Sequence, residues 1–224
     1  MAAAMGYHLN FGAVWRNFDL LLSGLGLGLL LATVAIFVGC WLGLAAAFAM
    51  NSRHPGWRRI AAVYVTVFRN SPPLVLILFM YFGLPYLGIR IGKYESFVLT
   101  LAIYAGAYLA EVFRGALLAL PGGLREAGLA IGLTEWQARL WIIIPVMFRN
   151  AFPSLANNFI SLFKDTSLAA AIAVPELTFY ARKINVETFR VVETWLVASL
   201  MYVATCYLIA AGLRLMERRL AIPR

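Results

Sequence analysis

The 224-residue chain has little charge for its size, and its first long apolar run has none. Only 13% of its residues are charged, 62% are hydrophobic and the mean hydropathy is +0.81, whereas a soluble domain is about a quarter charged. A monomeric globule cannot solvate so much apolar surface with so few charges. The composition therefore excludes a soluble enzyme, a disordered chain and a disulfide scaffold, and indicates an integral membrane protein.

Reactive and metal-binding residue types are also scarce. Cys40 and Cys206 lie inside apolar runs, where free cysteine behaves as a small hydrophobe, and His8 and His54 stand alone. No Ser/His/Asp or Cys/His set can be assembled, and no Gly-Lys-Ser/Thr follows a glycine-rich turn. We therefore expect no catalytic residue, no metal site and no bound cofactor in this chain. Any energy source would lie on another chain.

Long apolar runs predict an all-α fold with about five transmembrane helices. A crossing needs roughly 20 apolar residues, and backbone polar groups cannot be left facing lipid. The first run is uncharged from Leu20 to Met50, about twice the length of a signal-peptide core, so we interpret it as a retained span. The expected segments are residues 20–50, 60–87, 96–120, 150–176 and 191–216.

Glycines in the first run suggest close helix packing. Gly24 and Gly28 are four residues apart, as are Gly39 and Gly43. Such spacing lets a neighbouring helix approach closely. The alternative is the ordinary enrichment of glycine in membrane helices.

The distribution of Lys and Arg predicts the orientation, because basic residues collect in short cytoplasmic loops. With the C-terminus inside, eleven basic residues face the cytoplasm and six face outward. The net charges are then +8 inside and +1 outside, with Glu176 and Glu193 counted among the outer acids. We expect an outside N-terminal segment (1–19), a membrane domain (20–219) with a cytoplasmic loop at 121–149, and a cytoplasmic tail (220–224).

The long polar connection, residues 121–150, predicts two short helices. Residues 124–131 and 135–144 each have a helical pattern, and Gly132 and Thr134 supply the turn and a plausible N-cap between them. Pro145 is expected to end the second helix. A helical hairpin at the inner face of so small a membrane protein indicates a protein partner.

Four ionisable residues fall within or at the edges of the predicted spans: Arg69, Glu111, Lys164 and Asp165. A charge at membrane depth costs several kcal/mol unless it is paired or hydrated, so it indicates a pathway or a partner. Helical spacing puts Glu111 on one face with Tyr104 and Tyr108, and groups Lys164 and Asp165 with Asn157 and Ser161. The two stripes suggest a shared wet cavity. The alternative is structural, with Glu111 pairing Arg114.

The sequence Arg69-Asn70-Ser71-Pro72-Pro73 predicts a break in the second span. Tandem prolines remove backbone donors and clash with the preceding turn. A broken helix at membrane depth is tolerated where it lines a cavity or is buried in protein. The half-helix after the break, with Arg69 beside it, could attract a carboxylate. The alternative is a packing kink whose arginine reaches the inner interface.

At this point the sequence resembles a known family. Glu126-Ala127-Gly128, then Gly132, Ile142 and Ile144-Pro145 at the matching spacings, resemble the EAA loop of ABC-importer permeases, with Gly128 for Ala and Ile144 for Leu as mild departures. Residues 67–74, 107–115 and 163–168 are similar to the polar amino acid branch, which includes histidine, glutamate/aspartate, glutamine, arginine and opine permeases. Ser71 and Pro73 depart from that branch.

The resemblance implies a type I ABC importer in the bacterial inner membrane. Its partners would be an ATP-binding subunit dimer that holds ATP and Mg, a second permease subunit, an extracytoplasmic binding protein and an amino acid, with no nucleic acid. The ATPase-docking residues would be Glu126, Ala127, Gly128, Gly132, Thr134, Glu135, Trp136 and Pro145. The substrate path would be lined by Arg69, Asn70, Ser71, Tyr104, Tyr108, Glu111, Asn157, Ser161, Lys164, Asp165 and Thr166.

Two other functions stay open at this stage. A membrane scaffold or channel could use the same loop to recruit a cytosolic protein. A secondary transporter could use the intramembrane charges to carry protons, although the sequence shows no repeated halves. The neutral sum of the four intramembrane charges favours neither an acidic nor a basic substrate.

Overall fold

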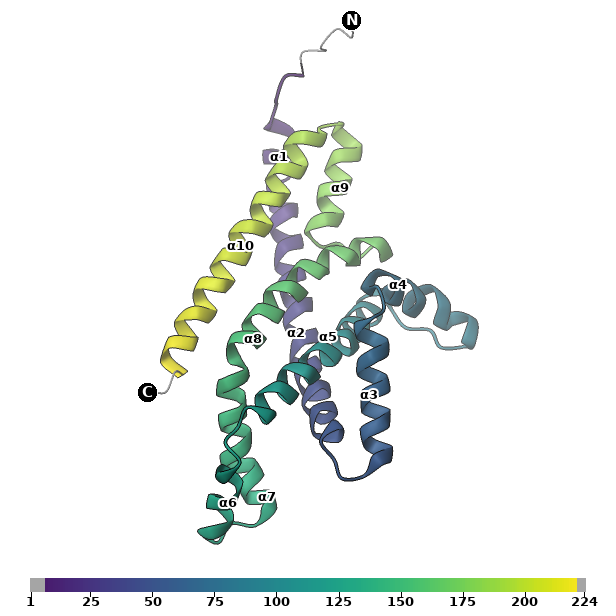
Figure 1. Cartoon of the computed structure of the whole chain (residues 1–224). Helices are drawn as coiled ribbons and strands as arrows, with labels where there is room; N and C mark the ends of the chain where they lie inside the picture. Colours follow the sequence, from purple (N-terminus) through teal and green to yellow (C-terminus); the bar gives the residue numbers. More distant parts are fainter. Residues whose placement is uncertain (1–6, 221–224) are drawn as a thin grey trace, which may run out of the picture.

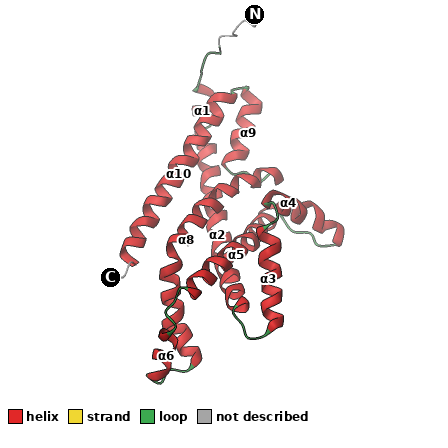
Figure 2. Cartoon of the chain, viewed as in Figure 1, coloured by secondary structure: helices red, strands yellow, loops and turns green. Residues whose placement is uncertain are grey.

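The computed structural model describes residues 7–220, and these form an all-helical bundle (Figures 1 and 2). No strand occurs between residues 7 and 220, so the all-α prediction is confirmed there. The first six residues of the predicted N-terminal segment and residues 221–224 of the predicted tail lie outside the described part of the chain.

The helices follow one another with short connections. In chain order they are α1 Gly12–Arg16, α2 Phe18–Met50, α3 Pro55–Arg69, α4 Pro73–Leu78, the π-helical η1 Phe79–Gly83, the 3-10 helix η2 Leu84–Leu87, α5 Lys93–Leu118, α6 Gly123–Ala130, α7 Glu135–Ala138, the π-helical η3 Arg139–Ile143, α8 Ile144–Asp165, the 3-10 helix η4 Thr166–Ile172, α9 Leu177–Thr188 and α10 Val191–Leu220. In Figure 1, α6, α7 and the α2–α3 loop lie at one end of the bundle, and α1 and the α9–α10 junction lie at the other.

Within residues 7–220, three helices are long and apolar enough to cross a membrane: α2, α5 and α10. The pair formed by α3 and residues 73–87 would be a fourth, bent by 102°. The predicted span at residues 150–176 is not among them, because α8 is long enough but too polar, with Arg149, Asn150, Asn157, Asn158 and Lys164 along it. After Asp165 the chain continues as η4 rather than as one straight helix.

The packing of α2 against α5 forms the centre of the bundle and depends on glycine. A Cβ built on Gly39 would lie 2.9 Å from the Ala105 Cβ and 3.1 Å from the Ala102 carbonyl oxygen. A Cβ on Gly43 would lie 2.8 Å from the Leu109 Cβ. The glycine spacing in the sequence therefore marks a close helix contact, as predicted, because no side chain fits between the two backbones.

Replacing Gly39 by valine is expected to destabilise the protein by about 1–3 kcal/mol, because the added carbons overlap the α5 backbone. Gly26→Val is the matched control, since nothing lies within 4 Å of a Cβ at Gly26 on the same helix. Thermal unfolding of both variants in detergent measures the difference. An equal loss of stability in the two variants would contradict the packing role of Gly39.

The predicted break of the second span is confirmed. Helix α3 ends at Arg69, and α4 begins at Pro73 with Pro72 as its N-cap. The side chains of Asn70 and Ser71 donate to the carbonyl oxygens of Thr66 (2.7 Å) and Val67 (2.8 Å) in the last turn of α3, and the Asn70 backbone N–H also donates to Thr66 at 3.3 Å. Two polar residues thus stabilise the end of one helix, and two prolines start the next.

The prediction that Pro145 ends the second hairpin helix is wrong. Pro145 lies in the first turn of α8, directly after the π-helical η3, whose wider turn accommodates a proline without ending the helix. The preceding π-helical η3 joins α7 to α8, so the chain stays helical from Glu135 to Asp165. A further proline, Pro153, lies inside α8.

Two carboxylates counted with the outer loops are in fact fully buried. Glu176 caps α9 by accepting the backbone N–H groups of Thr178 and Phe179, each at 2.8 Å, and the Tyr202 hydroxyl also donates to it at 2.8 Å. Glu193 accepts the Asn10 backbone N–H at 2.7 Å. Because Tyr202 and Asn10 come from distant parts of the chain, a count of charges along the sequence could not identify these two residues as buried.

Candidate functional site

The first candidate site is the helical hairpin, defined as residues 121–143. The predicted N-cap of its second helix is confirmed: the Thr134 hydroxyl accepts the Gln137 backbone N–H at 3.3 Å, and the Gln137 side chain accepts the Thr134 N–H at 2.8 Å. Gly132 has φ +88°, a left-handed conformation that glycine adopts without strain, as expected. The conformation of the turn is therefore determined by its own residues, through the Thr134 cap and the left-handed Gly132.

An ion pair joins the two helices of the hairpin. Arg125 on α6 donates to both carboxylate oxygens of Glu135 on α7, with Nε to Oε2 at 3.0 Å. This hydrogen bonding lowers the pKa of Glu135 below its ordinary value, and the charges of Arg139 and Arg53 add to the effect. The pair contributes stability above the ordinary pKa of Glu135 and loses it as pH falls through the lowered one. Both side chains are about half exposed, so the contribution is small.

The hairpin presents an apolar surface at its tip. Ile131 is 76% exposed and Trp136 is 69% exposed. Large apolar side chains at this level of exposure, rimmed by the exposed Glu126 and Glu135, are typical of a protein contact. Ile131 was not among the predicted docking residues, although its place beside the Gly132 turn could have indicated it.

Two of the predicted docking residues, Gly128 and Pro145, do not lie on the exposed surface of the hairpin. Gly128 is buried, and a Cβ on it would lie 2.9 Å from the Ile142 Cδ1 and 3.2 Å from the Ala138 Cβ. It lets α6 pack against α7 and η3. Pro145 lies at the start of α8, beyond the hairpin. Ala127, like Glu126, Thr134, Glu135 and Trp136, is exposed.

The second candidate site is a polar group at the break between α3 and α4. Tyr104 donates to the Tyr108 hydroxyl at 3.2 Å, and Tyr108 donates to the Arg69 carbonyl oxygen at 3.2 Å. The Arg69 guanidinium lies 5.3 Å from the centre of the Tyr108 ring and 3.9 Å from Glu111. The structure thus brings together residues that the sequence assigned to two different spans.

Glu111 is mainly paired with Arg114. The Arg114 Nη2 lies 2.7 Å from Glu111 Oε2, and the Arg114 Nε donates to the same oxygen at 2.8 Å. The ion pair with Arg114, which was the structural alternative for Glu111, is therefore shorter than its contact with Arg69. Arg69 has the looser contact and a side chain that is 42% exposed, so its guanidinium has donors free for a ligand.

The predicted stripe on α8 is only partly a surface. Asn157, Ser161 and Lys164 are exposed, and Asp165 is half-buried at the end of α8, where Leu162 packs in the same apolar cluster as Tyr104. Thr166 is fully buried, donates to the Phe163 carbonyl oxygen at 2.6 Å and lies against Gly28. Its side chain therefore does not share the exposed face of the other residues.

The predicted carboxylate seat at the start of α4 has fewer donors than a regular helix end. Pro72 and Pro73 occupy the N-cap and the first helical position, so neither has a backbone N–H. The Asn70 and Ser71 side chains are engaged with the end of α3. Any attraction for a carboxylate at the break therefore comes mainly from Arg69.

Residues 35–222 match the family described as "Binding-protein-dependent transport system inner membrane component". The chain belongs to this family. It is 36% identical to the glutamine transport system permease protein GlnP of Escherichia coli K12, over 95% of this chain and 98% of that protein. It is 32% identical to the L-cystine transport system permease protein TcyB of Bacillus subtilis 168, over 98% and 94%.

A solved structure shares this arrangement of helices. The chain superposes on the crystal structure of an amino acid ABC transporter with histidines at a TM-score of 0.86, with 31% identity, covering 95% of this chain and 100% of that one. The protein is thus a multi-pass inner-membrane permease of a binding-protein-dependent ABC importer, as the resemblance predicted. A permease of this kind works with an ATPase and a substrate-binding protein.

The permease has further residues at its two candidate sites that the sequence analysis did not single out. Arg125 had been counted only as a cytoplasmic charge, yet it ties α6 to α7. The signal that could have found it is the opposite charge of Glu135 across a turn marked by Gly132. No group of three or more His, Cys, Asp or Glu within the described part of the permease could hold a metal ion.

Proposed function

We propose that this permease moves a polar amino acid inward by alternating access, driven by ATP hydrolysis on a separate pair of ATPase subunits. ATP and Mg would bind to those subunits and not to this chain. The hairpin would dock in a cleft of the ATPase through Trp136 and its exposed neighbours. Closure of the ATPase pair would then move the permease as a rigid body between inward-facing and outward-facing states.

The observation that carries this proposal is the uninterrupted helical connection between the two candidate sites. Helices α7, η3 and α8 run without a break from Glu135 in the hairpin to Asp165 near the polar group. Figure 1 shows α8 rising from the hairpin end of the bundle toward its middle. Because a continuous helix transmits a displacement along its axis, movement of the hairpin moves the residues on α8.

The charge distribution supports the orientation and the partners. The hairpin, the α2–α3 loop and the start of α3 lie at the same end of the bundle and contribute five of the eleven basic residues expected in the cytoplasm: Arg53, Arg58, Arg59, Arg125 and Arg139. The ATPase would contact this end, and the binding protein would deliver substrate at the opposite end. A second permease subunit, identical or homologous, would complete the path.

The polar group favours a zwitterionic substrate. Arg69 offers guanidinium donors for an α-carboxylate, and Asp165 offers a half-buried carboxylate for an α-ammonium. Glu111 is less available because Arg114 already pairs with it. The names of the relatives make glutamine the first candidate, and a neutral polar side chain agrees with the balance of charge on the path.

The test is reconstitution of the permease with its ATPase in proteoliposomes. We expect uptake of labelled glutamine to require ATP on the side of the membrane that the ATPase faces. It should also require the binding protein on the opposite side. The rate of ATP hydrolysis should rise when the binding protein is loaded with amino acid. Uptake without ATP would instead indicate a channel or a secondary transporter, and hydrolysis indifferent to every amino acid tested would contradict the importer.

A further inference from the structure

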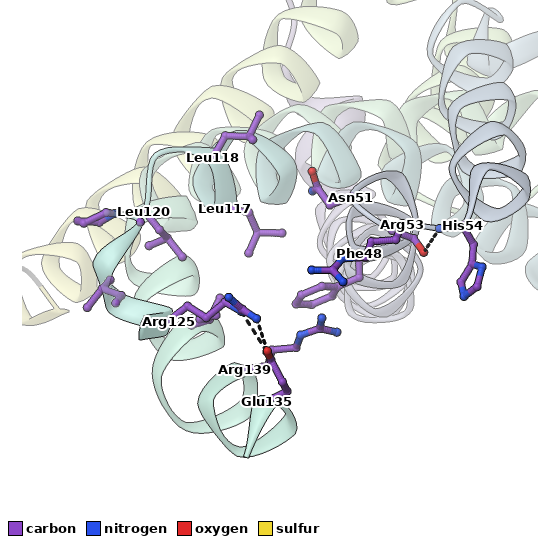
Figure 3. A pocket seen from close by; sticks show the side chains of 15 residues that line it. Phe48, Asn51, Arg53, His54, Leu117, Leu118, Leu120, Arg125, Glu135 and Arg139 are labelled. Carbon is purple, nitrogen blue, oxygen red and sulfur yellow. Dashed lines mark hydrogen bonds and ion pairs between the residues drawn. The ribbon is translucent and has the colours of Figure 1, made fainter. Parts of the chain in front are cut away.

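A cavity of about 710 Å³ lies beside the hairpin, at the level where two of the apolar helices end (Figure 3). It is bounded by the last turns of α2 and α5, by the α2–α3 loop and by α6 and α7. Seven of its fifteen lining residues, Glu135 among them, belong to the hairpin, but Ile131 and Trp136 do not line it, and neither does the polar group at the helix break. Docking through Trp136 therefore leaves this space on the inner side of the hairpin unexplained.

One side of the cavity is strongly basic. Arg53, Arg125 and Arg139 line it, and the only acidic residue in the lining is Glu135. Arg125 is paired with Glu135, whereas Arg53 and Arg139 have no carboxylate within 4.0 Å among residues 7–220. Two exposed guanidiniums with free donors therefore remain in one cavity. The planar N–H donors of a guanidinium can bind two oxygens of one phosphate.

The other side of the cavity is apolar and open to the surroundings of the bundle. Leu117 and Leu118 from α5 line it, and Leu118 is 64% exposed. Figure 3 shows these two leucines apart from Arg53 and Arg139, whereas the Phe48 ring lies beside the two arginines. A ligand that fits both sides has an anionic head and an apolar tail. Free inorganic phosphate would use only the basic side.

We propose that this cavity binds an anionic phospholipid, with the phosphate of its headgroup held by Arg53 and Arg139 and its acyl chain lying along Leu117 and Leu118. Basic pockets between membrane helices are the usual sites for such headgroups. The bound lipid bridges the α2–α3 loop and the hairpin, which belong to different parts of the chain. It therefore steadies the hairpin against the end of the bundle.

The test compares two double variants of the permease purified together with its ATPase. Arg53→Gln/Arg139→Gln removes both unpaired guanidiniums of the cavity. Arg58→Gln/Arg59→Gln is the matched control, because these exposed arginines on α3 carry the same charge outside the cavity lining. The complexes are exchanged into nanodiscs of phosphatidylcholine with some phosphatidylglycerol, extracted in mild detergent, and the retained lipid is counted by native mass spectrometry.

We expect retained phosphatidylglycerol to fall about tenfold in the cavity variant and to stay at the wild-type level in the control. Excess inorganic phosphate should not displace the lipid, because it lacks the apolar contacts. Equal retention in both variants would overturn the proposal, and so would displacement by inorganic phosphate, which would assign the cavity to the free ion. Loss of the co-purifying ATPase with unchanged lipid retention would also overturn it, by assigning the arginines to a protein contact. The readout is lipid retention, so its failure would leave the transport proposal untouched.

Discussion

Replacing Arg69 by glutamine is expected to reduce amino acid uptake at least about tenfold while the complex still assembles. Arg69 lies at the break between α3 and α4, and its closest carboxylate is 3.9 Å away. A charge-assisted hydrogen bond to a carboxylate is worth about 1.5–3 kcal/mol, and about 1.4 kcal/mol corresponds to a tenfold change in affinity. Uptake by proteoliposomes containing the variant complex measures the effect.

The control for this prediction is Arg58→Gln, which removes the same charge from the exposed start of the same helix. Arg69→Lys tests the chemistry further, because a lysine keeps the charge but loses the planar fork, so only partial recovery is expected. The Arg69 side chain stacks near Tyr108 without a short ion pair, so the helix break should survive both changes. Normal uptake by Arg69→Gln would remove this residue from the substrate path.

Replacing Gly132 by valine is expected to uncouple ATP hydrolysis from uptake. At φ +88° a β-branched residue is strained by about 1–3 kcal/mol, so the turn would rearrange. The turn is closed by two backbone bonds, Gly132 N–H to the Leu129 oxygen at 3.0 Å and Leu133 N–H to the Gly128 oxygen at 3.1 Å. Losing this geometry displaces Trp136 and Ile131 relative to each other. Uptake per ATP hydrolysed should fall about tenfold or more if the docking surface is lost.

A matched variant separates this effect from a general loss of folding. Gly123→Val adds the same side chain to the same hairpin, at an ordinary helical position where nothing lies within 4 Å. Its ratio of uptake to hydrolysis should stay at the wild-type value. If Gly132→Val and Gly123→Val show the same ratio, the left-handed turn has no role in coupling.

Local features of the fold could be predicted from the sequence because their causes are local. The Thr134 cap, the Gly132 turn and the break at Pro72 and Pro73 each depend on a few adjacent residues whose backbone preferences are strong. The spacing of Gly39 and Gly43 suggested a close helix contact, but it left ordinary glycine enrichment open and did not identify α5 as the neighbour. The cap, the turn and the break could thus be predicted without knowledge of their neighbours in space.

Features that depend on distant partners could not be predicted. Glu176 accepts a hydrogen bond from Tyr202 in addition to those from the start of α9, and the adjacent sequence does not show this distant tyrosine. Pro145 was expected to stop a helix, but its effect depends on where the helix starts, and here it occupies the first turn of α8. For the substrate path, the sequence identified Glu111 but could not decide between Arg69 and Arg114 as its partner.

The π-helical η3 sets the rotational phase between the hairpin and α8. A π turn accommodates one more residue than an α turn, and one residue corresponds to about 100° of rotation around a helix axis. The length of this turn, Arg139–Ile143, therefore sets how the hairpin is rotated relative to α8, whose own orientation is held by the packing of Met147, Ala151 and Leu162. A one-residue deletion in that turn would leave α8 in place but rotate Trp136 by about 100° around the helix axis, so the residue count at this joint is as important as the identity of the side chains at the tip.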